Sequence, residues 1–374
     1  MATAREQIHD DAPEPAPERP RLLFSTDLAG DDLLASLRAP GVLDILAEHG
    51  YGVALSLPEP DDACAEVVRL LNRRGIAAIA VLSLPPEDGF AFNLRNYPRA
   101  LGCYQTFHAW AQRHELRFEA VGLSIEPPLE DVAPVQRRGP RALLRRLWLA
   151  RENILYPSAR TAYSELIVAI HHDGYDVHTY QMPVIADDRR VGTTLIQRAL
   201  DIVDLPSDLD VLMCSSSVPI DLFDNDLGGA LVASYGESAD AIGVGSIGDP
   251  DLGWADDGDP ATEERAPLPW AALRRDLLLA GQHTDTIYVY SLEDCVERGL
   301  LPRIAKLDWD TPARAALRQR LVLAGLRGAL FAGLVTGRFG RAALAWGGWA
   351  VAIVLWLHGR RRRRSEISGR DEVS

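Results

Sequence analysis

The chain of 374 residues is long enough to bury one large core or two modest ones. Its 47% hydrophobic and 25% charged residues exclude both a wholly disordered chain and a polytopic membrane bundle. The net charge of -14 argues against nucleic-acid binding, because an acidic body repels phosphate backbones, and we expect no nucleic-acid partner.

Residues 1–20 have no apolar core and are rich in proline and acidic residues, which predicts a disordered leader rather than a signal peptide. Beyond the leader, short β-branched runs alternate with amphipathic helical stretches as far as residue 305. We predict eight strands, at residues 22–25, 52–57, 77–84, 119–126, 175–182, 210–216, 241–247 and 286–294.

Most of these runs are apolar on both faces, which predicts strands buried under helices and therefore a parallel sheet. Eight such units in residues 21–305 match an α/β fold of the (β/α)8 TIM barrel type, for which about 250 residues are typical. The alternative is an open doubly wound sheet, which usually has a glycine-rich turn after its first strand, and this sequence has none there. Three strand ends also echo one another (VALSLPEP, AVLSLPPED and AVGLSIEPP), as equivalent elements of a ring would.

Barrel enzymes carry their working groups at the C-terminal ends of the strands. Alternation along the fourth predicted strand turns one set of side chains toward the helices and another toward the lumen. The first set is Val121, Leu123 and Ile125, and the second is Ala120, Gly122, Ser124 and Glu126.

The small residues of the second set predict space beneath Glu126 at the rim of the barrel. A carboxyl in such a space loses hydration, so its pKa rises and it can serve as a general acid/base. The structural alternative is a salt bridge between Glu126 and an arginine at the rim.

The stretch FEAVGLSIEPP (118–128) resembles the fourth strand of chitinase-type glycoside hydrolases, in which an aromatic residue precedes an alternating Asp series that ends in the acid Glu. Phe118, Val121, Leu123 and Glu126 match that pattern, whereas Gly122 and Ser124 stand where the family has Asp. The resemblance implies a barrel that acts on a carbohydrate, with Glu126 as the acid. Since Ser124 has no charge, the acetamido-assisted chemistry of that family does not carry over.

Two later strands resemble the same family more loosely. DVLMCSS (210–216) matches the sixth-strand signature only at Met213. IYVYSLEDC (287–295) resembles the eighth strand, with Tyr290 and Leu292 in place and Glu293 or Asp294 as the terminal acid. The resemblance therefore makes Tyr290 and Glu293 candidate substrate-binding residues.

Conventional glycosidases need a second carboxylate near the first. Asp27 and Asp249 follow predicted strands, and Glu293 and Asp294 end the eighth predicted strand. We favour Asp294 as the second catalytic residue, because alternation puts it in phase with Tyr290.

The fifth predicted strand, YDVHTYQMP, supplies further candidate substrate-binding residues. His178 and Tyr180 share one face, and Gln181 lies near the strand end. Tyrosine and glutamine at a rim can stack on sugar rings and bind hydroxyl groups, and Ser124 can join them. The alternative is that these side chains are satisfied within a layer of the barrel.

No metal and no cofactor are expected. The four cysteines are far apart, so neither a zinc ribbon nor a disulfide scaffold is indicated. The adjacent His171 and His172 point apart on a turn and do not form a zinc site.

The C-terminal part of the chain has membrane character. Residues 341–359 contain an uncharged stretch of 18 residues, and residues 360–374 form a basic tail that begins with five arginines. A helix of that length spans about 27 Å, close to a bilayer core, which predicts a transmembrane anchor and a membrane location. The alternative is a buried C-terminal helix.

The side of the membrane that carries the barrel stays open. The arginines place the tail in the cytoplasm, and a single span would then require translocation of the barrel without a signal. Residues 306–340 are a helical connector or a first membrane segment; in the second case residues 321–335, apolar apart from Arg327, form a hairpin that removes the conflict.

Three functions remain open. The first is a membrane-anchored, glycoside hydrolase-like barrel that acts on a carbohydrate, and the second is a catalytically inactive barrel that binds a glycan or a protein partner. The third is a barrel enzyme of other chemistry, although the sole lysine, Lys306, follows the barrel and is poorly placed for a Schiff base.

Overall fold

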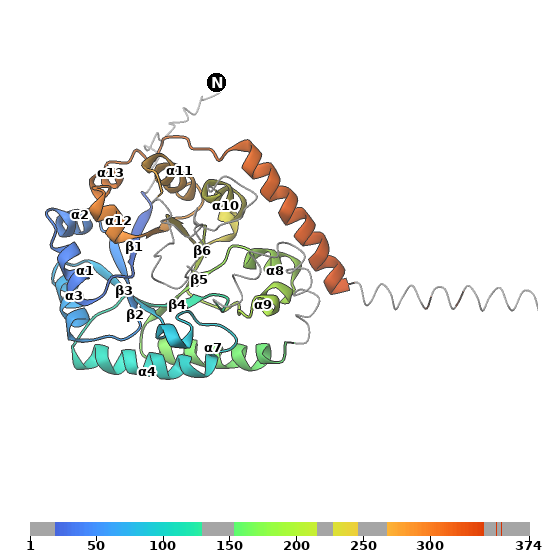
Figure 1. Cartoon of the computed structure of the whole chain (residues 1–374), viewed down its shortest axis with the longest axis horizontal. Helices are drawn as coiled ribbons and strands as arrows, with labels where there is room; N and C mark the ends of the chain where they lie inside the picture. The colour runs from blue at the N-terminus through green and yellow to red at the C-terminus, as the bar shows by residue number, and fades with distance from the viewer. Residues whose placement is uncertain are drawn as a thin grey trace, which may run out of the picture.

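Eight parallel strands form a closed barrel in the computed structural model, each paired with the next and β1 paired with β8 (Figure 1). The structure describes residues 19–128, 153–214, 227–245 and 268–339, together with Trp349 and Ile353. The TIM barrel prediction is confirmed, and the open doubly wound alternative is excluded by the β1–β8 pairing.

The strands lie close to their predicted positions. They are β1 (Arg21–Thr26), β2 (Gly52–Leu57), β3 (Ala77–Leu82), β4 (Ala120–Ile125), β5 (Asp176–Gln181), β6 (Leu209–Met213), β7 (Ala241–Gly245) and β8 (Thr286–Tyr290). The described helices of the ring are α1 (Gly30–Leu37), α2 (Val42–Glu48), α3 (Asp62–Arg73), α4 (Tyr97–Arg113), α7 (Leu155–His172), α8 (Ile185–Val191), α9 (Leu195–Ala199), α10 (Gly228–Tyr235), α11 (Trp270–Ala280), α12 (Leu292–Glu297) and α13 (Leu301–Ala305).

The eighth strand is shorter than predicted. It ends at Tyr290, and α12 begins two residues later, because Ser291 caps that helix by accepting a hydrogen bond from the Asp294 backbone N–H at 3.4 Å. The prediction of a strand through Asp294 was therefore wrong. The serine–leucine–acid order that resembled a strand end is a helix start.

The strands separate two hydrophobic clusters, as their alternation predicts. Val121, Leu123 and Ile125 of β4 pack in the outer cluster beneath the helices, whereas Ala120 packs in the inner cluster that fills the lumen. The other members of the inner cluster are Leu23, Ala54, Ile79, Tyr180, Val211, Ala241 and Tyr288. Three of its members are alanines, which make room for the two tyrosine rings.

A further helix, Leu317–Phe339, follows the ring and runs along its outside, coloured orange-red in Figure 1. It is long and apolar enough to cross a membrane by length and composition, with a hydropathy of 1.4. Its Leu334 packs against Val191 of α8 and Ile196 of α9. The predicted anchor at 341–359 lies outside the described residues except for Trp349 and Ile353, which are helical and exposed.

Candidate functional site

Glu126 lies at the C-terminal mouth of the barrel, directly after β4. Its backbone N–H donates to the Phe92 carbonyl at 3.1 Å, and the Phe92 N–H donates to the Ser124 carbonyl at 2.9 Å. The loop after β3 therefore pairs with the end of β4 and fixes the backbone of Glu126. Phe92 is fully buried, so this loop forms part of the wall of the barrel.

The Glu126 carboxyl is held by a neighbour on its own strand. The Ser124 hydroxyl donates to Glu126 Oε1 at 2.6 Å. Burial raises the pKa of Glu126, and the Ser124 hydrogen bond offsets part of that rise. A carboxyl that keeps its proton closer to neutral pH is suited to protonate a leaving group.

The space beneath Glu126 is occupied, contrary to the expectation from the small residues of β4. A Cβ on Gly122 would lie 2.6 Å from the ring of Tyr180, so glycine at this position makes room for that ring. Tyr180 in turn meets Tyr288 of β8 edge-on, with ring centroids 5.1 Å apart. The carboxyl therefore lies over a floor of aromatic rings.

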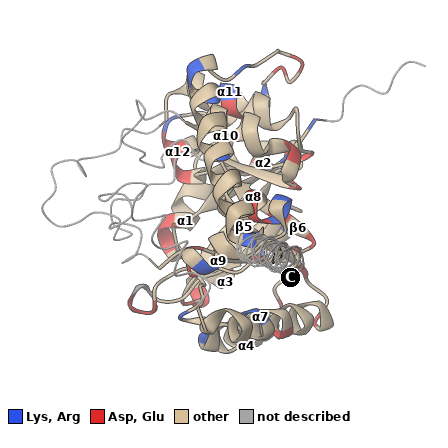
Figure 2. Cartoon of the chain, turned by 90° about the vertical axis from the view of Figure 1, so that its right-hand side faces the viewer, with Lys and Arg blue, Asp and Glu red and all other residues tan. Residues whose placement is uncertain are grey.

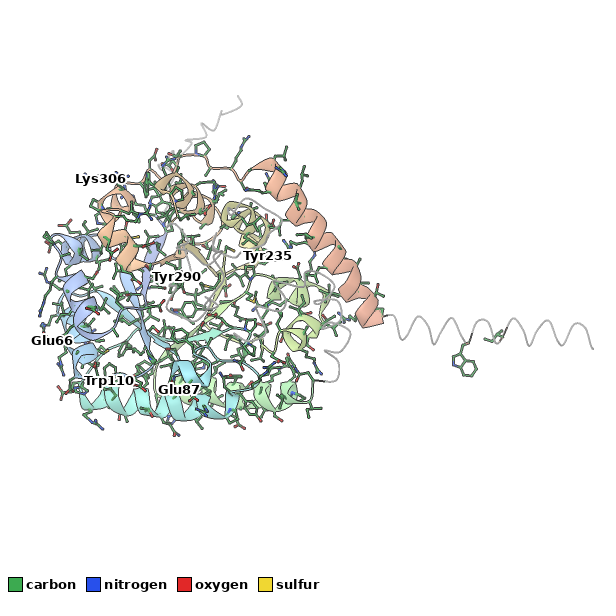
Figure 3. All side chains as sticks on the ribbon, in the orientation of Figure 1. Glu66, Glu87, Trp110, Tyr235, Tyr290 and Lys306 are labelled. Carbon is green, nitrogen blue, oxygen red and sulfur yellow. The ribbon has the colours of Figure 1, made fainter. Side chains whose placement is uncertain are left out.

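Tyr290 of β8 packs against the inner cluster, inside the ring of strands in Figure 3. Burial raises the pKa of Tyr290. Glu126 shares the inward phase of β4 with Ala120, Gly122 and Ser124, so its side chain points toward the mouth.

His178 lies one layer deeper on the same face of β5 as Tyr180. Its Nδ1 shares a hydrogen bond of 2.6 Å with the Tyr288 hydroxyl, and burial lowers its pKa, so the imidazole is neutral near pH 7. His178 is 7% exposed and supports the aromatic floor from below. The structure thus brings Ser124, Glu126, His178, Tyr180 and Tyr290 to the lumen side of the sheet, and their roles in catalysis or substrate binding stay predictions.

Serines line the wall opposite β5 to β8. Ser56 and Ser83 share a hydrogen bond of 3.3 Å at the ends of β2 and β3, and Ser25 lies on β1. The similar sequences at the ends of these strands therefore place serine hydroxyl groups around half of the mouth. Ser25 Oγ and Tyr180 Oη are buried and form no hydrogen bond of normal length and angle with the described residues, although the hydroxyl groups of Tyr290 and Tyr288 lie near them.

The favoured second carboxylate is not where alternation put it. Asp294 lies in the first turn of α12, out of the strand phase of Tyr290. Glu293 instead comes close to β1, where its Oε1 accepts from the Asp27 backbone N–H at 3.5 Å. Asp27 directly follows β1 and therefore lies at the same end of the barrel as Glu126, which makes it the better second carboxylate among the described candidates; Asp249 lies outside the described residues.

Gln181 is separated from the other candidates because it points away from the lumen. Its Nε2 donates to Asp210 Oδ1 of β6 at 3.1 Å and to Thr179 Oγ1 at 3.3 Å. Successive residues on a strand face opposite ways, so Tyr180 and Gln181 cannot both line the mouth. This correction follows from alternation alone.

The described mouth is acidic and rich in hydroxyl groups. Its carboxyl groups are Asp27, Glu126 and Glu293, and no group of three His, Cys, Asp or Glu side chains in the described residues is arranged to hold a metal ion. The arrangement offers a proton donor, hydrogen-bonding hydroxyls and aromatic surface. Those are the features by which proteins bind neutral polyhydroxylated ligands.

Neither a protein-family model nor a curated protein matches the chain by sequence. The solved structures that resemble it in shape include the following three. The PgaB (BpsB) glycoside hydrolase domain from Bordetella bronchiseptica is 13% identical, with 77% of this chain and 98% of that chain covered and a TM-score of 0.42. A family 2 AP endonuclease from Brucella melitensis is 13% identical, with 77% and 100% covered and a TM-score of 0.41. The spore cortex-lytic enzyme SleL from Bacillus megaterium is 11% identical, with 75% and 72% covered and a TM-score of 0.41.

These similarities assign no activity to the chain, because the TM-scores and identities are low and the three proteins differ in function. The barrel itself is established by the pairing of its own strands. Any statement about activity has to come from the residues at the mouth.

Proposed function

We propose that this protein is a membrane-anchored, glycoside hydrolase-like barrel that acts on a carbohydrate, with Glu126 as general acid/base. The observation that carries the proposal is the environment of Glu126, whose carboxyl faces the mouth, accepts a hydrogen bond from Ser124, and has a pKa raised by burial. A proton held in this way can be given to the oxygen of a leaving group.

The second carboxylate in this proposal is Asp27. It directly follows β1, so it lies at the same end of the barrel as Glu126, which directly follows β4. Two carboxyl groups at one mouth are what a conventional glycosidase needs. Ser25, Ser124, Tyr180 and Tyr290 would bind the hydroxyl groups and faces of the sugar.

The test uses a matched pair of substitutions on one strand. The full chain in detergent is screened for turnover of polysaccharides and chromogenic glycosides, and Glu126→Gln is compared with Glu119→Gln. Glu119 precedes β4 at the other end of the barrel, where it pairs with Arg21 at 2.5 Å. We expect Glu126→Gln to lower kcat by about 10²- to 10⁴-fold and Glu119→Gln to leave it unchanged. Equal activity of Glu126→Gln and the unsubstituted protein would remove Glu126 from the mechanism.

The second candidate is a barrel that binds a glycan or protein partner without cleaving it. Ser124 in place of an acid favours this alternative, because the only hydrogen bond described for the Glu126 side chain comes from an uncharged hydroxyl. A glycan array separates the two functions. Binding that persists in Glu126→Gln, with no turnover of the bound glycan by either form, selects the binding function.

A further inference from the structure

The helix Leu317–Phe339 has two different faces. On the inner face, Leu323 and Leu334 are 7% and 1% exposed, and Leu334 packs against α8 and α9. On the other sides of the helix, large apolar side chains are open to the surroundings. They are Leu317, Leu321, Leu326, Phe331 and Phe339, with exposures of 69%, 64%, 42%, 40% and 52%.

Arg327 fastens the inner face to the barrel. Its guanidinium pairs with Asp187 of α8 at 2.8 Å, lies 3.9 Å from the ring centroid of Tyr235, and donates to the Ser234 carbonyl. The Tyr235 hydroxyl donates to the other oxygen of Asp187 at 2.8 Å. The Arg327 and Asp187 side chains are 17% and 3% exposed. Figure 3 places Tyr235 on the side of the barrel next to this helix.

This contact opposes insertion of the helix across a bilayer. If the helix left the barrel, Asp187 would be buried without its partner cation, and Arg327 would enter hydrocarbon near the middle of the span. The only charged group within residues 321–337 is therefore accounted for by a contact with the barrel. The outer face of the same residues has no charge.

The charge of this part of the chain is one-sided. Residues 311–364 contain eleven arginines and no acidic residue, whereas the whole chain is acidic. Arg318 and Arg320 lie near the start of the helix, and Arg338 lies at its end. Arginines at both ends of an uncharged face attract the headgroups of an anionic bilayer.

A basic hollow lies where the helix ends. It has a volume of about 300 Å³ and is lined by Arg198 of α9, Arg338, Thr193 and Thr194, with no acidic residue in its lining. Figure 2 looks onto this flank of the barrel, which carries α8 and α9. Guanidinium and hydroxyl donors in an open hollow suit the phosphate of a lipid headgroup.

We infer that the helix Leu317–Phe339 lies flat in the interface of an anionic lipid bilayer, with its outer apolar face toward the lipid and its inner face holding the barrel through Arg327 and Asp187. The barrel is then mounted on the membrane in a fixed orientation and does not swing on a flexible tether. This inference rests on the membrane attachment in the proposed function and is independent of the carbohydrate chemistry. It also argues against the hairpin, since residues 321–335 stay outside the hydrocarbon core.

Nitroxide labels on the full chain test the inference in vesicles of phosphatidylcholine and phosphatidylglycerol. Leu321→Cys, Ala329→Cys and Thr336→Cys place labels along the outer face, and Val168→Cys, 68% exposed on α7, is the matched control. Cys103 is replaced by serine in all four, because the other three cysteines are buried. We expect the three helix labels to be immersed to a similar shallow depth, with raised accessibility to oxygen and lowered accessibility to a nickel chelate. The α7 label should remain in water.

Two outcomes would overturn the inference. A depth that is greatest at Ala329 and small at both ends would show that the helix crosses the bilayer. If the protein floats with the vesicles but its helix labels are as accessible to water as the α7 label, the helix does not touch lipid. If the protein does not float with the vesicles, the membrane attachment in the proposed function is contradicted. Turnover of carbohydrate is measured on the same preparation, so the carbohydrate activity is tested independently of the membrane attachment.

Discussion

Strand β5 separates two polar regions of the barrel. On the lumen side, the Tyr180 hydroxyl is buried and forms no hydrogen bond of normal length and angle with the residues that the structure describes, and the same holds for the Ser25 hydroxyl. On the outer side, Arg189 of α8 donates to Asp204 at 2.8 Å and to Asp210 at 2.5 Å. The lumen region contains uncharged hydroxyl groups, the outer region contains paired charges, and the two lie on opposite faces of the same sheet.

The difference shows which polar groups are available to a ligand. A buried hydroxyl without a partner costs about 1–3 kcal/mol, so those at the mouth weaken the fold unless water or a ligand binds them. In the outer region the single Arg189 guanidinium pairs with two carboxyl groups and stabilises the contact of α8 with β6. We therefore assign a binding role to the lumen side and a structural role to the outer side.

The largest effect is expected when the outer network is broken. Arg189→Met should lower the free energy of unfolding by about 3 kcal/mol, because it leaves the 9% exposed Asp210 side chain without its cation. Thermal unfolding of the full chain in detergent measures the loss. The matched control is Arg38→Met, since Arg38 pairs with Glu66 on the surface, where the side chains are 59% and 50% exposed. That control should cost less than about 1 kcal/mol, and an equal loss in both would contradict the assignment.

A smaller loss is expected from filling the glycine position under Glu126. Gly122→Ala would place a Cβ 2.6 Å from the Tyr180 ring, so the ring must move and the free energy of unfolding should fall by about 1–3 kcal/mol. The same substitution at Gly102 of α4 meets no atom within 4 Å and should stabilise the helix by about 0.5–1 kcal/mol. Opposite signs in the two variants would confirm that the Tyr180 ring, and not glycine content, sets the cost. A neutral Gly122→Ala would mean that the lumen has free space.

Two buried tyrosines allow the stability cost of losing a hydrogen-bonded hydroxyl group to be compared with that of losing a hydroxyl group without a described partner. Tyr163 Oη donates to the Asn93 carbonyl at 2.8 Å, so Tyr163→Phe should cost about 1 kcal/mol in the free energy of unfolding. Tyr180→Phe removes a hydroxyl with no described partner and should leave stability unchanged or slightly higher. If Tyr180 binds a sugar hydroxyl, the same variant should bind its glycan about tenfold more weakly. A loss of stability as large as that of Tyr163→Phe would show that the Tyr180 hydroxyl has a structural partner.

Much of this arrangement could be predicted from the sequence because it depends on local periodicity. Alternation along β4 gave the correct face for Val121, Ser124 and Glu126, and eight apolar runs between amphipathic stretches gave the ring. Gln181 could also have been placed correctly, because it directly follows Tyr180. Its outward direction follows from the same rule that placed Tyr180 inward.

The remaining features depend on contacts between distant segments or on competing local signals. The Tyr180 ring fills the space over Gly122 only because β4 and β5 pair with Gly122 beside His178, a register that no local pattern encodes. Arg327 pairs with Asp187 although the two are separated by 140 positions in the sequence. At Asp294 two local signals conflicted, since a serine three residues before an acid starts a helix as readily as it ends a strand.

The smallest expected effect is a difference in how the stability of variants at the two ends of β4 depends on pH. Burial raises the pKa of Glu126, so the folded state binds this proton more tightly than the unfolded state. Its contribution to stability is present below the unfolded pKa and is lost as the pH rises through the folded pKa. Glu126→Gln should therefore gain stability relative to the unsubstituted protein as the pH rises from about 4 to 7.

At the other end of the strand, the hydrogen-bonded Arg21 lowers the pKa of Glu119, so the sign is reversed. Its contribution is present above the unfolded pKa and is lost as the pH falls through the folded pKa. Glu119→Gln should be less stable than the unsubstituted protein at pH 7, with the deficit shrinking toward pH 3. Unfolding curves recorded across this range compare the two slopes within one strand. If the stability difference of both variants changed with pH in the same direction, the fold would stabilise the Glu126 carboxyl as an anion. Glu126 could then not be assigned as the general acid that protonates a leaving group.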